Sequence, residues 1–213
     1  MLAGNDGRLY AAVLADGVSL CSASRTGAEV ACKVLLKLFL LKGDMLLDNS
    51  EACDNEGKSQ LIISHVLYEL AEKAKSEARD LEEYSCTLSG VLADSESGKM
   101  LYFSLGDSII IAVSRCGLRC RILTRPDNNH EGICVTTTKD AAAMSKLGIE
   151  SMKDFASVII FSDGAWREIF NRNVIKNEVK EILAVQNYDK LKEFLKGREI
   201  FDDYSFIALN LET

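Results

Sequence analysis

The sequence predicts an α+β fold built on antiparallel β-structure, and three observations predict this class. Two long segments carry apolar residues at helical intervals, and residues 85–124 form a block of short apolar runs separated by turn residues. Helices and strands do not alternate strictly, as they would around a parallel sheet. With 213 residues and 47% hydrophobic content, the chain can form a substantial core. We therefore expect one domain over residues 1–213.

The first strand and the first helix are predicted by local patterns. Residues 9–15 are apolar and run directly into Asp16, which predicts a strand that ends in a turn. Thr26 and Glu29 have the spacing of a capping box, and apolar residues follow at helical intervals. We therefore expect a helix over residues 26–41.

A second helix and an antiparallel meander are expected next. The polar segment 43–58 predicts a solvated connection, and the apolar face of residues 62–74 predicts the second helix. Short apolar runs follow, and the closely spaced turn residues between them predict the meander. These runs are residues 86–92, 99–105, 109–114 and 118–123.

The C-terminal half is expected to mix strands with short helices. Residues 133–137 and 157–161 predict strands, and the second strand ends just before Asp163. The other expected elements are a short helix over residues 139–147, a helix or turn over 165–170, helices over 174–185 and 188–196, and a final strand over 204–211.

Composition and charge argue against several classes of function. A formal net charge of −7 at pH 7 gives the protein no general attraction for nucleic acid or an anionic membrane. No apolar run approaches the ~20 residues of a membrane span, and the N-terminus lacks the pattern of a secretion signal. The seven cysteines include no C-x-x-C pair, which disfavours a zinc site and favours reduced thiols in the cytoplasm.

Three aspartates lie where an apolar strand meets a turn. Asp16, Asp163 and Asp202 each occupy such a position, from which a rigid scaffold can present a carboxylate. Converging carboxylates repel one another unless a cation lies between them, and oxygen ligands favour Mg²⁺ or Mn²⁺. Two such ions can activate a shared water for attack on phosphorus, without a protein nucleophile. The aspartates therefore predict metal-dependent hydrolysis of phosphate esters.

The candidate residues also have ordinary structural explanations. An isolated Asp-Gly pair is usually only a turn. Asp107 lies in Gly106-Asp107-Ser108, which is compatible with either a hairpin turn or a metal site, and Asp203 is expected to be a solvated turn residue. Arg25 could help to bind phosphate, but an exposed position beside the helix is favoured. The phosphate-binding residues therefore stay unknown.

Six short motifs occur in a fixed order over nearly the whole chain. They are Val13-Leu14-Ala15-Asp16-Gly17-Val18, Gly27-Ala28-Glu29-Val30-Ala31, Ser85-Cys86-Thr87-Leu88, Leu105-Gly106-Asp107-Ser108, Ile159-Ile160-Phe161-Ser162-Asp163-Gly164 and Asp202-Asp203-Tyr204-Ser205-Phe206. In order and spacing they resemble the metal-dependent protein phosphatase family, the protein phosphatase 2C-like serine/threonine phosphatases. The resemblance implies a single protein phosphatase 2C-like domain in which two packed antiparallel sheets are flanked by helices, an α-β-β-α sandwich.

The resemblance also implies an activity and a set of metal ligands. Family members hydrolyse phosphoserine and phosphothreonine esters of phosphoproteins, with a metal-activated water as the attacking group. By position, Asp16 resembles the carboxylate that bridges two Mg²⁺ or Mn²⁺ ions, and the carbonyl of Gly17 resembles a ligand of the second ion. Asp163 and Asp202 resemble the other ligands of the first ion. Asp107 matches a position that some members use for a weaker third metal.

The match to the family is incomplete in two places. The family normally has an acidic motif on a strand ahead of the first Asp-Gly turn, and this motif supplies a ligand for the second metal. Asn5-Asp6 resembles it, but Asp6-Gly7 favours a hairpin turn before the strand at residues 9–15, so that first strand is expected to be missing. The segment Val18-Ser19-Leu20-Cys21-Ser22 also stands in place of the usual Gly-Gly turn. A second hypothesis is therefore a pseudophosphatase that acts as a signalling or binding module.

Overall fold

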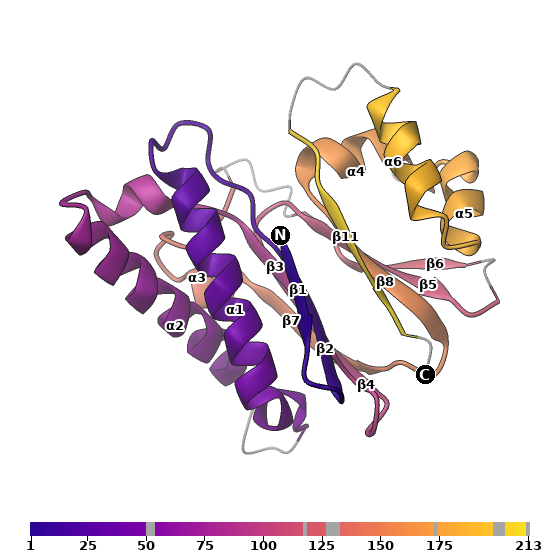
Figure 1. Ribbon diagram of the computed structural model, residues 1–213, viewed down its shortest axis with the longest axis horizontal. Helices are drawn as coiled ribbons and strands as arrows, with labels where there is room; N and C mark the ends of the chain where they lie inside the picture. Colours follow the sequence, from indigo (N-terminus) through magenta and orange to yellow (C-terminus); the bar gives the residue numbers. More distant parts are fainter. Residues whose placement is uncertain (50–53, 117–118, 127–132, 173, 198–202, 212–213) are drawn as a thin grey trace.

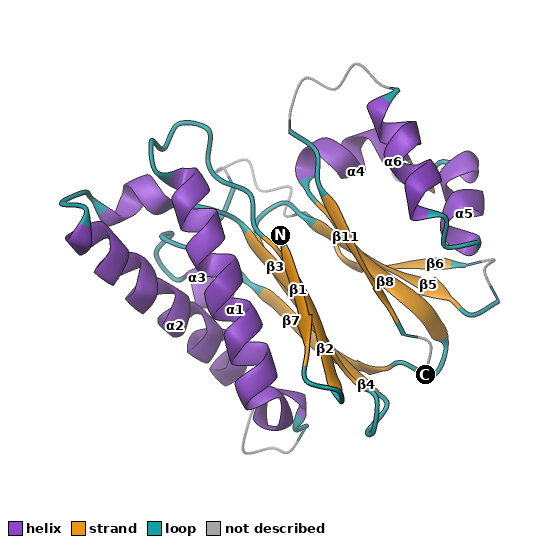
Figure 2. Cartoon of the chain, in the orientation of Figure 1, coloured by secondary structure: helices purple, strands orange, loops and turns teal. Residues whose placement is uncertain are grey.

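Two antiparallel sheets lie face to face between two layers of helices (Figures 1 and 2). The computed structural model describes residues 1–49, 54–116, 119–126, 133–172, 174–197 and 203–211. The expected α-β-β-α sandwich is thus confirmed.

The first sheet is formed mainly by the N-terminal half of the chain and has the order β1-β2-β3-β4-β7. All of its neighbouring strands are antiparallel. Its strands are β1 Leu2–Asn5, β2 Leu9–Leu14, β3 Leu88–Asp94, β4 Lys99–Leu105 and β7 Lys146–Ser151. Two long helices, α1 Ser24–Leu47 and α2 Asn55–Ser76, cover its outer face (Figure 1).

The second sheet has the order β11-β8-β5-β6 and is also antiparallel. Its strands are β5 Ile109–Ser114, β6 Cys120–Thr124, β8 Phe155–Phe161 and β11 Phe206–Asn210. Its outer face is covered by α4 Asp163–Ile169, α5 Asn177–Ala184 and α6 Tyr188–Lys196 (Figure 1). The smaller elements are the 3-10 helix η1 Leu81–Tyr84, α3 Ala141–Met144, β9 Phe170–Asn171 and β10 Val174–Ile175.

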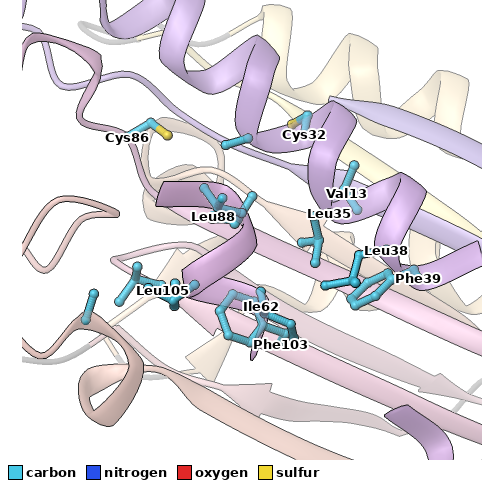
Figure 3. Packing of buried hydrophobic residues seen from close by; sticks show 14 of the residues in the cluster. Val13, Cys32, Leu35, Leu38, Phe39, Ile62, Cys86, Leu88, Phe103 and Leu105 are labelled. Atoms are coloured by element: carbon cyan, nitrogen blue, oxygen red, sulfur yellow. The ribbon is translucent and has the colours of Figure 1, made fainter. Parts of the chain in front are cut away.

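Strands β5 and β8 are apolar along nearly their whole length because both of their faces are buried. In β8, Ile159 and Phe161 pack under the C-terminal helices, whereas Val158 and Ile160 face the first sheet. The first sheet contributes Leu14 and Val91, among others, to this middle layer. On its outer face, residues such as Val13, Leu35, Phe39, Ile62 and Phe103 pack between the sheet, α1 and α2 (Figure 3).

The prediction of one meander was wrong, because β4 and β5 belong to different sheets. The segment Gly106-Asp107-Ser108 therefore crosses from the first sheet to the second and is not a hairpin turn. Gly106 has φ +106°, and a Cβ there would lie 2.7 Å from the Thr87 side chain. A close approach of this kind requires glycine.

The first helix is longer than predicted, and the connection that follows it is shorter. Helix α1 begins at Ser24, and its N-cap residue Ala23 makes no side-chain capping bond, so the predicted capping box at Thr26 is not used. The predicted end at Leu41 falls beside an irregular residue, Lys42, but the helix continues to Leu47. The reason is burial: Gly43, Leu46 and Leu47 pack into the core beside Leu9.

Strand β1 was not predicted, whereas the hairpin turn that follows it is confirmed. The Asp6 carboxylate accepts hydrogen bonds from the backbone N–H groups of Leu9 (2.7 Å) and Arg8 (3.0 Å), and these bonds lower its pKa. Gly7 adopts the φ of +99° that the turn needs. Asp6 thus lies at the opposite end of β2 from Asp16, about 20 Å along the strand.

Three other predicted elements were wrong in part. Residues 133–135 have no regular structure and residues 136–137 belong to a turn, so the predicted strand over 133–137 is wrong. The helix predicted over 139–147 is confined to Ala141–Met144, since Leu147 and Ile149 alternate towards the core as strand residues do. The helix predicted over 174–185 begins only at Asn177, because Val174 and Ile175 pair with Asn171 and Phe170.

Candidate functional site

A cleft of about 670 Å³ lies at the end of the sandwich where β2 and β8 both finish. The loop after β2, the start of β3, the β4–β5 link, helix α4 and the segment before β11 all contribute to it. Its described lining residues are Asp16, Gly17, Val18, Ser19, Leu20, Cys21, Ser85, Thr87, Asp107, Ile133, Val135, Asp163, Arg167 and Asp203. In contrast, a groove of about 710 Å³ between α1 and α2 has no aspartate among its described lining residues.

The cleft brings together most of the residues that the sequence singled out. Asp16, Gly17, Asp107 and Asp163 line it, although they come from three separate parts of the chain. Asp202 lies outside the described residues. Its neighbour Asp203, which was expected to be a solvated turn residue, is exposed but also lines the cleft.

Asp16 is held in place by hydrogen bonds to the start of the β3 segment. The N–H of Thr87 donates to the Asp16 carbonyl at 2.8 Å, and the Asp16 N–H donates to Thr87 Oγ1 at 3.0 Å. Gly17 forms an antiparallel bridge with Cys86, and the Val18 N–H donates to the Ser85 carbonyl at 3.1 Å. These paired backbone contacts fix the main chain from which the Asp16 carboxylate projects.

Gly17 lies directly against the start of α1. A Cβ at this position would be 2.8 Å from Ser24 Oγ and 2.9 Å from the Ser24 carbonyl carbon. Any side chain would force the loop away from the helix, so the position requires glycine. The Asp16-Gly17 pair is therefore more than an ordinary turn.

Asp163 is the first residue of α4 and is engaged through both carboxylate oxygens. Oδ1 accepts a hydrogen bond from the Gly164 N–H at 2.7 Å, and Oδ2 pairs with Arg167 Nη2 at 3.1 Å. The side chain is 13% exposed. Ser162, just before it, accepts the Ser205 N–H at Oγ and donates its own N–H to the Ser205 carbonyl, both at 2.9 Å. Helix α4 and the segment before β11 are thus tied together beside the carboxylate.

Asp107 is linked to the same helix through Trp166. The indole Nε1–H donates to the Asp107 carbonyl at 2.7 Å, and the ring packs edge-on against Phe170 with 6.1 Å between centroids. The tryptophan therefore has a packing role. It also holds the link between the two sheets against the helix that carries Asp163.

Arg167 is the site residue that sequence reasoning missed. Among the cleft-lining residues that the structure describes, it is the one Lys, Arg or His. The spacing from Asp163 to Arg167 on a predicted helix is a signal that could have found it, since residues four apart share a helix face. Arg25, considered for phosphate binding, is instead 96% exposed and lies 3.8 Å from Glu29.

Cys86 lies directly behind Asp16 but does not line the cleft. Its side chain is fully buried, and this burial raises the pKa of the thiol to about 12. A thiol with this pKa stays protonated near neutral pH and is a poor nucleophile. Cys86 therefore serves as a small packing residue in the core.

The carboxylates of the cleft suit a hard divalent cation, and Asp202, a further predicted ligand, lies outside the described residues. Among the described residues, no three His, Cys, Asp or Glu side chains are close enough to hold a metal by themselves. Mg²⁺, however, usually keeps several waters and binds through only one or two carboxylates. One carboxylate oxygen of Asp163 is paired with Arg167, and the other accepts the Gly164 N–H. The carboxylates of Asp16 and Asp163 thus fit such an ion.

The chain thus forms an α-β-β-α sandwich with an acidic cleft at one end. The family profile of Protein phosphatase 2C matches residues 2–197. The chain therefore belongs to the protein phosphatase 2C family, which is a family of protein phosphatases.

Similar solved structures show the same fold. A bacterial serine phosphatase is 17% identical and has a TM-score of 0.73, with 99% of this chain and 91% of that chain covered. The serine/threonine phosphatase Stp1 from Staphylococcus aureus is 17% identical, with a TM-score of 0.71 and coverages of 100% and 89%. RsbX, solved in complex with magnesium, is 16% identical, with a TM-score of 0.54 and coverages of 97% and 83%. A search of curated proteins found no match.

No helix in the described part of the chain is both long and apolar enough to cross a membrane.

Proposed function

We propose that this protein is a Mg²⁺- or Mn²⁺-dependent phosphatase that removes phosphate from phosphoserine and phosphothreonine residues of proteins. The observation that carries the proposal is the meeting of Asp16 and Asp163 in one cleft of a family fold, just beyond the ends of β2 and β8, which belong to opposite sheets. The magnesium complex of RsbX, a protein with a similar fold, supports the choice of cation. Both halves of the chain are needed to form the cleft, so residues 1–213 act as one domain.

The residues of the chain divide the work between them. The proposed metal ligands are the carboxylates of Asp16, Asp163 and Asp202 and the carbonyl of Gly17. Asp107 is a candidate ligand for a weaker third metal. Bound divalent ions would supply charge neutralisation for the phosphoryl group and acidify a water for attack. Thr87 holds the Asp16 backbone, and Trp166 holds the Asp107 link. An open cleft of this size admits a phosphorylated side chain on a protein surface.

The six described cysteines are free thiols, and this supports a reducing cytoplasm as the place where the enzyme acts. The acidic net charge disfavours nucleic acid and anionic membranes as partners and leaves phosphoproteins as the proposed substrates.

The alternative function is a pseudophosphatase that binds a partner without turnover. Two observations favour it. The described acidic groups do not by themselves complete a metal site, and Arg167 forms an ion pair with Asp163. It predicts binding of phosphopeptides without release of phosphate.

An activity assay distinguishes the two functions. The purified protein is incubated with p-nitrophenyl phosphate and with a phosphothreonine peptide, in Mn²⁺, in Mg²⁺ or in a chelator. We expect turnover that depends on the metal and that falls about 100-fold or more in Asp163→Asn, because a ligand of the ion is lost.

Asp189→Asn is the matched control, since Asp189 also lies in the first turn of a helix, α6, but is not among the described residues that line the cleft. This variant should keep full activity. Equal turnover with chelator, or in folded Asp163→Asn, would show that the activity does not come from this site.

A further inference from the structure

Arg167 places a positive charge of the protein itself inside the candidate metal site. Its Nη2 lies 3.1 Å from Oδ2 of Asp163, the carboxylate proposed as a ligand. The pair joins residues four apart on α4, so both groups project from the same face of one short helix. Part of the negative charge that would attract a divalent ion is therefore already neutralised.

The Arg167 guanidinium also contacts the aromatic ring of Trp166. Arg167 Cζ lies 5.9 Å from the centre of the Trp166 ring, a distance at which a cation is attracted to an aromatic face. Trp166 is in turn anchored to the Asp107 carbonyl and to Phe170. The arginine side chain is nevertheless 57% exposed, so it can leave Asp163 for solvent without disturbing the core.

A guanidinium and a divalent ion cannot both bind this carboxylate closely without repelling each other. Metal entry at Asp163 therefore requires the guanidinium to withdraw, and the energy of the ion pair opposes metal binding.

We propose that the Arg167 guanidinium competes with the divalent cation for the Asp163 carboxylate and so sets the metal concentration at which the site fills. This inference rests on the metal site of the proposed function. It predicts a gain of affinity when the positive charge is removed.

The test is a calorimetric titration of the full chain with Mn²⁺, in the absence of any substrate. We expect Arg167→Gln to bind Mn²⁺ about fivefold more tightly than the wild type, the size of effect that a partly exposed ion pair provides. Arg167→Lys, which keeps the charge but loses the planar fork, should lie between the two. Quenching of Trp166, the one tryptophan of the sequence, should follow the same order.

Arg121→Gln is the matched control. Arg121 is 61% exposed and pairs with Glu150 at 2.7 and 2.8 Å, on β6 and away from the cleft lining. The substitution changes the net charge by the same amount, but its Mn²⁺ affinity should stay within about twofold of the wild type. Damage to the site would weaken metal binding, so a gain that is specific to Arg167 indicates competition.

Several results would overturn the inference. Unchanged or weaker binding in Arg167→Gln, an equal gain in Arg121→Gln, or no Mn²⁺ binding by either the wild type or Arg167→Gln would each do so. A gain that persists in an Asp163→Asn background would also contradict it, because the competition must act through that carboxylate. If the affinities change as expected but no variant releases phosphate from a phosphothreonine peptide, the proposed function fails while the competition stands.

Discussion

The two sides of the cleft hold their aspartates by different means. On the N-terminal side, Asp16 exchanges two hydrogen bonds with Thr87, and the adjoining Gly17 forms a bridge with Cys86, beneath two long helices. On the C-terminal side, Asp163 belongs to a helix of seven residues and is held by a local N–H group and by the partly exposed Arg167. The difference suggests a fixed carboxylate opposite an adjustable one, and each prediction below changes one side.

The largest expected effect comes from the contact that supports the fixed side. Gly27 of α1 packs against the main chain of Tyr84, and an added Cβ would overlap the Tyr84 carbonyl oxygen. That backbone leads directly into the residues that hold Asp16. Gly27→Ala should therefore lower the free energy of unfolding by about 3 kcal/mol or prevent folding. Urea denaturation followed by circular dichroism measures the change.

The control for this substitution lies on the adjustable side. At Gly197, after α6, the nearest atom to an added Cβ is the Glu193 carbonyl oxygen at 3.5 Å. Gly197→Ala should change stability by less than about 0.5 kcal/mol. Similar stability losses at Gly27 and Gly197 would remove the basis for distinguishing the two sides.

A smaller effect is expected from the hydroxyl that accepts the Asp16 N–H. Thr87→Val keeps the shape of the buried Thr87 side chain but leaves the half-buried Asp16 N–H without Oγ1 as its partner. The expected loss of stability is about 1–3 kcal/mol, with weaker Mn²⁺ binding because Asp16 loses its support. Thr87→Ser, which keeps the oxygen, should lose much less. If Val and Ser are equally stable at this position, the hydrogen bond does not hold Asp16.

The smallest effect concerns the reactivity of Cys86, whose side chain is buried behind Asp16, and it involves no substitution. Since its pKa is raised to about 12, the Cys86 thiol should carry almost no thiolate at pH 8 and should not react with iodoacetamide in the folded protein. The exposed Cys116 should react under the same conditions. Mass spectrometry of the alkylated peptides measures both rates, and modification of Cys86 at the rate of Cys116 would contradict its burial.

Local patterns were enough to predict the parts of the fold with a strong period. The continuous apolar run of β8 and the helical face of α2 each left a clear signal, and Asp16 and Asp163 were placed at strand ends because those runs stop abruptly. The family motifs supplied the sandwich itself. Their combined order was more specific than any single Asp-Gly pair.

The sequence did not reveal which strands pair with one another when they are far apart in the chain. The link at Gly106-Asp107-Ser108 has the length of a hairpin turn, and nothing local indicates that it joins two sheets. Strand β7 was missed because the alanines before it favour a helix and only Leu147 and Ile149 show the alternation of a strand. Arg167 was missed because its role depends on Asp163 and Trp166 lying beside it in the folded cleft.

The central claim is that a divalent cation bridges the two sides of the cleft. Anomalous scattering from crystals soaked in Mn²⁺ tests it most directly, because the signal locates the ion without reference to activity. The account predicts at least one strong peak in the cleft within about 2.5 Å of carboxylate oxygens from both Asp16 and Asp163. Peaks confined to other surfaces, or a cleft without a peak at saturating Mn²⁺, would contradict it.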